Sequence, residues 1–345
     1  MKTRITELFG IKYPILMSGM SWISVPKMVA SVSNAGGLGI LATGPLNSES
    51  TRKAIREVRE LTDKPFGVNL ALLFPGAKEN AKISLEEKVP VINFAGGKGD
   101  WLVKKAHEYG AKVAATVVGP RHALRAQDYG CDAVIATGHE AAAHGEGLTT
   151  FILVPTLVDV VKIPVIAAGG VGDGRGLAAA LALGAEGVAM GTRFMTTKES
   201  PLNNVYKKLS VEKAATETLF SDCFDGLLCR VMKTDAAERA MRRGLDLPAA
   251  FFNAREITQQ LNTPFWKVFA GVVVSGWKSA KQMAFLANAF KAFRLATEDG
   301  DMKNGLLPIG QVTGLIKDEP TVKELFERII AEAKESQERM VEKIS

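Results

Sequence analysis

The stretch IPVIAAGGVGDGRGLAAALALGAEGVAMGTRF, residues 163–194, decides the fold of this chain. It holds two short apolar runs, Ile163–Ala168 and Gly187–Met190, and small residues follow each run. Between them, Gly174–Leu183 is rich in Ala and Leu, which favours a helix, and Asp173 is a suitable N-cap. Strand, helix and strand make one βαβ unit, and apolar strands without polar alternation are typical of a parallel sheet covered on both faces.

Small residues end both strands of this unit, Gly169 and Gly170 after the first, Gly191 and Thr192 after the second. Glycine lets a backbone approach a ligand closely, and neighbouring backbone N–H groups can hold a phosphate without a lysine. We therefore interpret the two adjacent strand ends as a phosphate-binding site. A single Gly-Gly would be better explained as a simple turn, whereas two such ends on neighbouring strands favour the phosphate site.

The same unit recurs from the start of the chain. The expected strands are Tyr13–Met17, Gly39–Ala42, Pro65–Leu70, Val89–Phe94, Lys112–Val118, Asp132–Ala136, Ile163–Ala168 and Gly187–Met190. The expected helices between them include Val25–Asn34, Ser48–Leu61, Asp100–Tyr109, Arg121–Tyr129, Thr149–Val161 and Gly174–Leu183. Eight alternating units favour a closed barrel over an open sheet, so we predict an α/β fold of the (β/α)8 TIM-barrel type.

The alternation ends after Phe194. Helical composition continues in VYKKLSVEKAATETLF, AAERAMRRGL and AKQMAFLANAFKAFRLA, which predicts a mainly helical cap subdomain inserted after strand 8. An amphipathic helix then starts at Thr321, whose spacing to Glu324 matches a capping box, and we expect it to pack on the barrel. The predicted division is a barrel of residues 1–198 and 300–345 with a cap of residues 199–299.

Composition limits the function. The formal charge of +6 is spread along 345 residues without a basic run, which favours acidic small-molecule ligands over nucleic acid or a membrane. Three cysteines form no CxxC pair, the start of the chain lacks a signal-peptide core, and no apolar run reaches 18 residues. We expect a cytoplasmic protein.

In barrels of this kind the chemistry lies at the carboxyl ends of the strands. The candidate site residues by this criterion are Gly19, Met20, Asn69, Thr116, the segment Gly138–Gly147, Gly169, Gly170, Gly191 and Thr192.

Of four histidines, His144 is the candidate for catalysis. It lies among small residues in HEAAAHGEG after the sixth strand, whereas His107 and His122 belong to outer helices. His139 and His144 are five residues apart, about 140° on a helix, so they do not match the zinc motif HExxH and we predict no metal. A structural histidine is the alternative interpretation of His144.

Other nucleotide and hydrolase motifs are absent. The glycines at 170, 172, 174 and 176 do not fit G-x-G-x-x-G, and neither a P-loop nor a G-x-S-x-G elbow occurs. These absences argue against a Rossmann dinucleotide site, a P-loop nucleotide site and a serine hydrolase.

Six segments in fixed order, PILMSGMSW, NAGGLGIL, PFGVNL, EAAAHGEG, AAGGVGDGRG and MGTRF, resemble the nitronate monooxygenases, formerly called 2-nitropropane dioxygenases. They are also similar to the related flavin-dependent enoyl-acyl-carrier-protein reductases and flavin NADH:quinone reductases. The resemblance extends from Thr6 to Phe194 and returns in GDMKNGLLPIGQVTGLIKDEP.

The resemblance implies an FMN-bearing barrel in which His144 faces the flavin. Its phosphate would be bound by Gly169, Gly170, Gly191 and Thr192, with Ala168 and Met190 beside them. Gly19 and Met20 would lie along the isoalloxazine ring, Asn69 would hydrogen-bond its polar edge, and Thr116 would stand where some relatives carry a lysine. Loss of that cation weakens electrostatic support for an anionic reduced flavin.

The activity expected from the resemblance is oxidation of alkyl nitronates with O2 to a carbonyl compound and nitrite. An enoyl-acyl-carrier-protein reductase or quinone reductase that uses NAD(P)H is the alternative, to which HGEGLTT is more similar. A flavin-binding scaffold is the non-enzymatic alternative. The expected substrate is a nitronate or an enoyl thioester, and a homodimer is left open.

Overall fold

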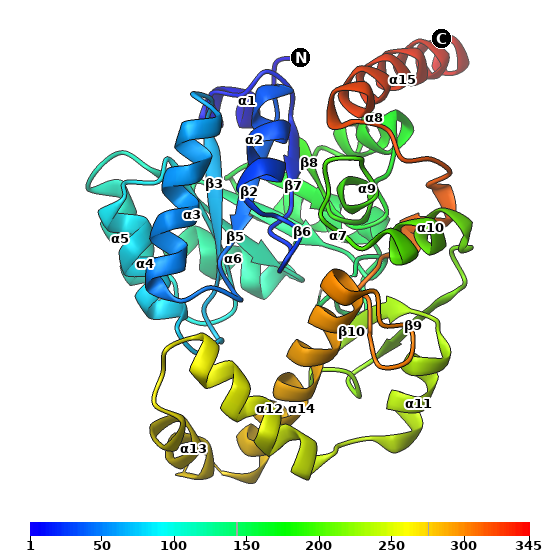
Figure 1. The fold of residues 1–345 in the computed structure, drawn as a ribbon. Helices are drawn as coiled ribbons and strands as arrows, with labels where there is room; N and C mark the ends of the chain where they lie inside the picture. Colours follow the sequence, from blue (N-terminus) through cyan, green and yellow to red (C-terminus); the bar gives the residue numbers. More distant parts are fainter. Residues whose placement is uncertain (143, 275) are drawn as a thin grey trace.

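Eight parallel strands form a closed barrel in chain order (Figure 1). This computed structural model describes residues 1–142, 144–274 and 276–345. The strands are β1 (Ile15–Met17), β2 (Leu38–Ala42), β3 (Phe66–Ala71), β4 (Val91–Ala95), β5 (Lys112–Val117), β6 (Ala133–Thr137), β7 (Val165–Ala168) and β8 (Gly187–Met190). β8 closes the barrel by pairing with β1, with Met190 opposite Met17. The predicted TIM barrel is confirmed.

Helices cover the outside of the barrel as the sequence pattern predicts. They are α2 (Pro26–Asn34), α3 (Ser48–Leu61), α4 (Ala77–Glu86), α5 (Asp100–His107), α6 (Pro120–Asp128), α7 (Thr150–Val160) and α8 (Gly174–Ala182), preceded by α1 (Arg4–Phe9). The Asp173 side chain accepts a hydrogen bond from Gly176 N, so its predicted N-cap role is confirmed. The apolar residues between strands and helices form one continuous core.

The last outer helix comes from the carboxyl end of the chain. After β8 the chain makes only the short helix α9 (Thr192–Met195), and α15 (Val322–Ile344) packs against α8 and α2 instead. Thr321 and Glu324 form the predicted capping box. The backbones of α8 and α15 approach so closely that a Cβ on Gly174 would lie 2.3 Å from Ile329 O. This position agrees with the prediction that the final helix packs on the barrel.

Between α9 and α15 the chain forms an insert. Its elements are α10 (Asn204–Glu212), β9 (Thr218–Ser221), β10 (Cys229–Met232), α11 (Asp235–Arg243), α12 (Leu247–Gln260), α13 (Phe265–Val274), α14 (Trp277–Arg294), a π-helical turn (Leu295–Asp299) and a 3-10 turn (Gln311–Leu315).

The predicted helix over VYKKLSVEKAATETLF is wrong in its second half. The helix ends at Glu212, and β9 pairs antiparallel with β10. The Glu217 carboxylate accepts the backbone N–H of Ala214, which turns the chain, and the guanidinium of Arg230 lies 4.9 Å from the centre of the Phe220 ring. Long-range strand pairing therefore outweighs the local helix propensity of this segment.

The insert lies at the carboxyl ends of the barrel strands. Gln260 Nε2 donates to Pro45 O after β2, and the Phe290 ring packs edge-on against Trp22 after β1, with 4.7 Å between ring centroids. Figure 1 shows α12, α13 and α14 on this side of the barrel. The division at residues 198 and 300 stays a prediction.

Within the insert, the start of α10 and the π-helical turn after α14 meet at one point. Asn203 N donates to Thr297 O at 2.9 Å, and Asn203 Nδ2 donates to Glu298 O at 3.1 Å. Within the ranges given above, no helix carries an apolar run long enough to cross a membrane.

Candidate active site

The glycine ends of β7 and β8 lie side by side because these two strands pair directly. Gly169 and Gly170 have φ angles of +100° and +74°, a region that glycine adopts readily and other residues rarely do. Gly191 has a φ of −106°, so no backbone constraint requires glycine there. A Cβ at Gly191 would instead lie 3.4 Å from the sulfur of Met20, which is ordinary contact. Backbone conformation therefore explains glycine at the end of β7 and does not explain it at the end of β8.

The backbone carbonyl groups of the residues that precede these glycines already accept hydrogen bonds within the protein. Ala168 O accepts from Gly138 N at 2.9 Å, and Met190 O accepts from Ser18 N at 3.0 Å. Thr192 is buried, and its Oγ1 accepts from Gly310 N at 3.0 Å. Gly310, which the sequence analysis did not select, thus connects the returning chain to the end of β8.

A row of polar side chains crosses β3, β4 and β5. Asn69 Nδ2 donates to Asn93 Oδ1 at 2.6 Å, and Asn93 Nδ2 donates to Thr116 Oγ1 at 3.0 Å. Gly19 lies directly on this row, since a Cβ there would be 2.4 Å from Asn69 Cβ. The structure therefore brings Gly19, Asn69 and Thr116 together. Asn93 was missed, although an amide within the apolar run Val89–Phe94 was a usable signal.

Met20 is held by a buried serine that the sequence analysis also missed. Ser24 Oγ accepts from Met20 N at 2.9 Å and donates to Ser18 O at 2.8 Å. Its hydroxyl thereby fixes the loop after β1, and Met20 packs against both the barrel core and the insert.

His144 is paired with a buried carboxylate from the insert. Its Nε2 lies 2.6 Å from Asp225 Oδ2, and the two side chains are 43% and 2% exposed. Asp225 Oδ1 accepts from Leu227 N at 3.0 Å, which fixes the carboxylate. Because a carboxylate only accepts, Nε2 of His144 is the donor in this contact, and in the neutral imidazole the lone pair is then on Nδ1. Asp225 lies 81 residues away in the chain, so no local pattern could identify it.

The other residues around His144 have structural contacts. His139 Nδ1 lies 3.1 Å from Glu146 O, and the Glu140 carboxylate accepts from the N–H and hydroxyl groups of Thr150. His139 and His144 lie in turns, not on a helix. Ala143, a small neighbour of His144 in the predicted segment, lies outside the described residues. His107, on the outer helix α5, contacts Asp132.

Cys229 lies beside this pair, and one ligand atom from each of Cys229, His144 and Asp225 lies within 4.8 Å of the others. Metal binding requires a thiolate. Burial and the neighbouring Asp225 raise the pKa of the Cys229 thiol well above its ordinary value, which favours the neutral thiol. The absence of a metal at this cluster stays a prediction.

A closed α/β barrel with glycine at two adjacent strand ends, a polar row and a carboxylate-bound histidine at one mouth is the arrangement of a barrel enzyme. The chain belongs to the nitronate monooxygenase family, whose model matches residues 2–332. It is therefore an oxidoreductase, and the predicted family is confirmed.

Relatives with different activities match this chain over most of its length. A dehydrogenase of Rhodococcus jostii, (3aS,4S,5R,7aS)-5-hydroxy-7a-methyl-1-oxo-octahydro-1H-indene-4-carboxyl-CoA dehydrogenase, is 37% identical over 96% of both chains. A probable nitronate monooxygenase of Staphylococcus aureus is 32% identical over 72% of this chain and 82% of its own. The structure of FabK from Thermotoga maritima is 38% identical, with a TM-score of 0.84 over 99% of this chain and 98% of that one.

Proposed function

We propose that this protein is an FMN-dependent oxidoreductase whose cofactor binds at the mouth of the barrel. The observation that carries the proposal is the pair of adjacent glycine ends. Gly169 and Gly170 turn their backbone through positive φ, and a side chain is absent at Gly191 where the chain passes Met20. Such a surface of backbone N–H groups fits a phosphate group.

The remaining site residues fit the ring of a flavin. Asn69 gives its amide N–H to Asn93, and among the described residues no donor is directed at its Oδ1. This oxygen is thus available to accept a hydrogen bond from the polar edge of the ring, while Gly19 and Met20 would border one face. Thr116 orients Asn93 and supplies no positive charge. Bound FMN supplies two-electron chemistry, because its N5 accepts and returns a hydride.

His144 is the proposed proton-transfer group. The Asp225 carboxylate keeps the proton on Nε2, so Nδ1 can accept a proton from a carbon acid or orient a carbonyl or nitro group through a bound proton. Asp225 is proposed to position His144, because its carboxylate hydrogen-bonds to the imidazole and to Leu227 N.

Two substrate classes have support. An acyl thioester is favoured by the relative whose name specifies a CoA ester, which matches 96% of both chains. Nitronate oxidation is favoured by the family model and by the staphylococcal relative. The net charge of +6 suits the anionic character of both. NAD(P)H as electron donor, a cytoplasmic location and a homodimer stay predictions.

Anaerobic mixing tests the proposal. The purified protein is mixed in turn with propyl nitronate, NADH and NADPH while flavin absorbance is followed, and reduced protein is then mixed with crotonyl-CoA. Bleaching by the nitronate supports nitronate oxidation, whereas bleaching by a pyridine nucleotide with reoxidation by the thioester supports a reductase. A purified protein that binds no FMN, even after reconstitution, contradicts the whole proposal.

A further inference from the structure

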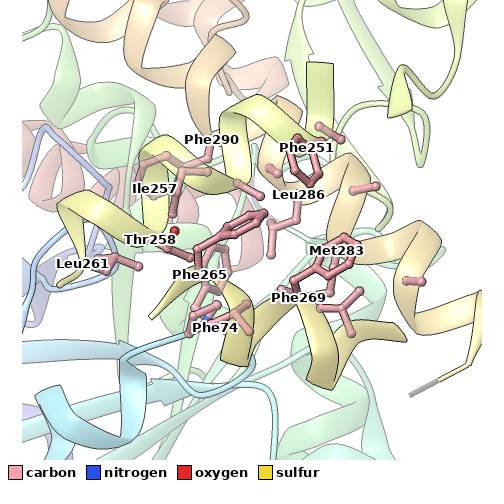
Figure 2. Close-up of a pocket in the computed structure, with 18 of the residues that line it drawn as sticks. Phe74, Phe251, Ile257, Thr258, Leu261, Phe265, Phe269, Met283, Leu286 and Phe290 are labelled. Carbon is pink, nitrogen blue, oxygen red and sulfur yellow. The ribbon is translucent and has the colours of Figure 1, made fainter. Parts of the chain in front are cut away.

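An apolar cavity of about 300 Å³ lies within the insert, between α12, α13 and α14 (Figure 2). Phe251, Phe265, Met283 and Phe290 are among the side chains that line it. No charged residue is among the described residues of its wall, and Thr258, which carries the polar side chain there, donates its hydroxyl to Arg255 O. The cavity therefore offers apolar contact and no unpaired polar group to a ligand.

Small side chains keep this space open. Five alanines line the cavity, on helices that could carry larger apolar residues at the same positions: Ala250, Ala254, Ala280, Ala284 and Ala287. The space opens to solvent, because Leu247, Phe251 and Phe269 of its wall are 49%, 36% and 40% exposed, and contiguous exposed apolar surface marks binding sites. An unfilled space lined by alanines indicates room for something other than the protein's own side chains.

Polar contacts outside the cavity fix the helices around it. Asn253 Nδ2 on α12 donates to Asn288 Oδ1 on α14 at 2.8 Å. Glu256 on α12 accepts from Lys291 and Arg294 on α14 at 3.1 and 2.7 Å. Because α12 and α14 are bridged on this side, closing the cavity would require breaking these contacts.

The wall of the cavity is continuous with the loops of the candidate active site. Phe74 and Pro75 of the wall follow β3, the strand that carries Asn69. Phe290 packs against Trp22, which follows Met20 in the loop after β1. Trp22 has a φ of +61°, an uncommon conformation for a large residue that occurs preferentially at functional sites.

We propose that this cavity binds the hydrocarbon part of the substrate whose reactive group lies at the mouth of the barrel. The proposal rests on the proposed function and specifies its substrate class. An apolar cavity of about 150 Å³ is large enough for benzene, so about 300 Å³ accommodates on the order of ten carbon atoms. Ethyl or propyl nitronates would leave most of this space empty, whereas a thioester with a medium-length acyl chain would fill it.

The test measures binding of saturated, unreactive thioesters to the holoprotein by calorimetry. Butanoyl-, octanoyl- and dodecanoyl-CoA are compared. The dissociation constant should fall by up to about fourfold for each added CH₂ and then level off once the cavity is full. Equal affinity for all three thioesters overturns the proposal, and this result needs no variant.

Filling the cavity supplies the second part of the test. Ala254→Phe on α12 and Ala287→Phe on α14 should each remove the preference for octanoyl-CoA over butanoyl-CoA. Ala270→Phe is the matched control, because Ala270 is exposed on α13 and does not line the cavity. Circular dichroism and FMN content identify variants that fold. A chain-length preference that persists in a folded filling variant places the hydrocarbon elsewhere.

The two proposals fail in different ways. Loss of the proposed function appears as a protein without FMN or without flavin reduction by any donor. Binding of saturated thioesters requires no turnover, so a flat chain-length series in a protein that binds and reduces FMN rejects only the cavity proposal.

Discussion

Replacing Asp225 should impair catalysis through His144 while FMN binding and the barrel remain intact. Asp225→Ala removes a hydrogen bond of 2.6 Å between a 2%-exposed carboxylate and the imidazole. Hydrogen bonds to charged groups contribute about 1.5–3 kcal/mol. Because the His144 side chain is 43% exposed, we discount this contribution to about 1–2 kcal/mol, or roughly a 5–30-fold loss of kcat/KM.

Asp225→Asn should be at least as harmful to the reaction, although it keeps the shape of the side chain. An amide that turns its NH₂ toward Nε2 makes this nitrogen the acceptor and transfers the ring proton to Nδ1. The proposed base is then blocked. The loss should approach that of His144→Ala, about 10²–10⁴-fold for a step that needs a positioned base.

The assay compares kcat/KM of wild type, Asp225→Ala, Asp225→Asn, His144→Ala and the corresponding double variants. Nitroethane, which must lose a carbon-bound proton, is compared with ethyl nitronate, which has none to lose. If wild type does not use nitroethane, the reactive thioester replaces it. In the His144→Ala background either change at Asp225 should have little further effect. A second, additive loss in that background would refute the positioning role, and so would wild-type activity in both single variants.

Three further predictions concern the cofactor site and the fold. Gly170→Ala and Gly110→Ala both place a side chain at positive φ, +74° and +85°, so each variant should lose about 1–2 kcal/mol of stability. Only Gly170→Ala should weaken FMN binding in a fluorescence titration, because Gly110 lies at the opposite end of the barrel. Equal FMN affinities of the two variants would move the phosphate site away from β7. Burial, with the neighbouring Asp132, raises the pKa of the Cys131 thiol from 9.0 to about 12. Between these pH values only the unfolded chain releases this proton, so the free energy of unfolding should fall as the pH rises. Denaturant titrations should show a smaller fall in Cys131→Ala than in Cys223→Ala, and the same dependence on pH in both variants would contradict the role of Cys131. Gly174→Ala should lower the free energy of unfolding by about 1–3 kcal/mol, because its Cβ meets the backbone of α15. Gly119→Ala should be nearly neutral, because a Cβ there would meet nothing within 4 Å. Equal shifts of the two variants in thermal unfolding would contradict this account of the α8–α15 contact.

The barrel could be predicted from the sequence because its information is local. Each strand is a short apolar run and α8 has its own N-cap in Asp173, so β7, α8 and β8 could be located from one continuous stretch. The strand pair β9 and β10 was missed, although Asp225-Gly226 between the two strands is a turn signal and Gly226 has a φ of +82°.

The candidate site divides along the same line. Glycines at strand ends can be recognised in the sequence, and Gly169 and Gly170 do adopt positive φ. The roles of Asn93 and Ser24 depend on hydrogen bonds to Asn69 and Met20, which form only in the folded barrel. Each could have been suspected as a polar residue in or beside an apolar run. Asp225 could not, since its partner His144 is 81 residues away and only the folded insert unites them.

Hydrogen bonds from Asn203 to Thr297 and Glu298 join the start and the end of residues 203–298, so this part of the chain forms a closed loop. We call this junction the anchor. For a loop closed at this anchor, the entropy of closure changes by only about 0.6 kcal/mol when its length doubles. Changes of length within this span therefore cost little closure entropy, but exchange of the whole span would remove Asp225, which holds His144. Substrate preference should therefore be open to re-engineering by transplanting α12, α13 and α14, with Asp225 and the cofactor-binding strands left unchanged.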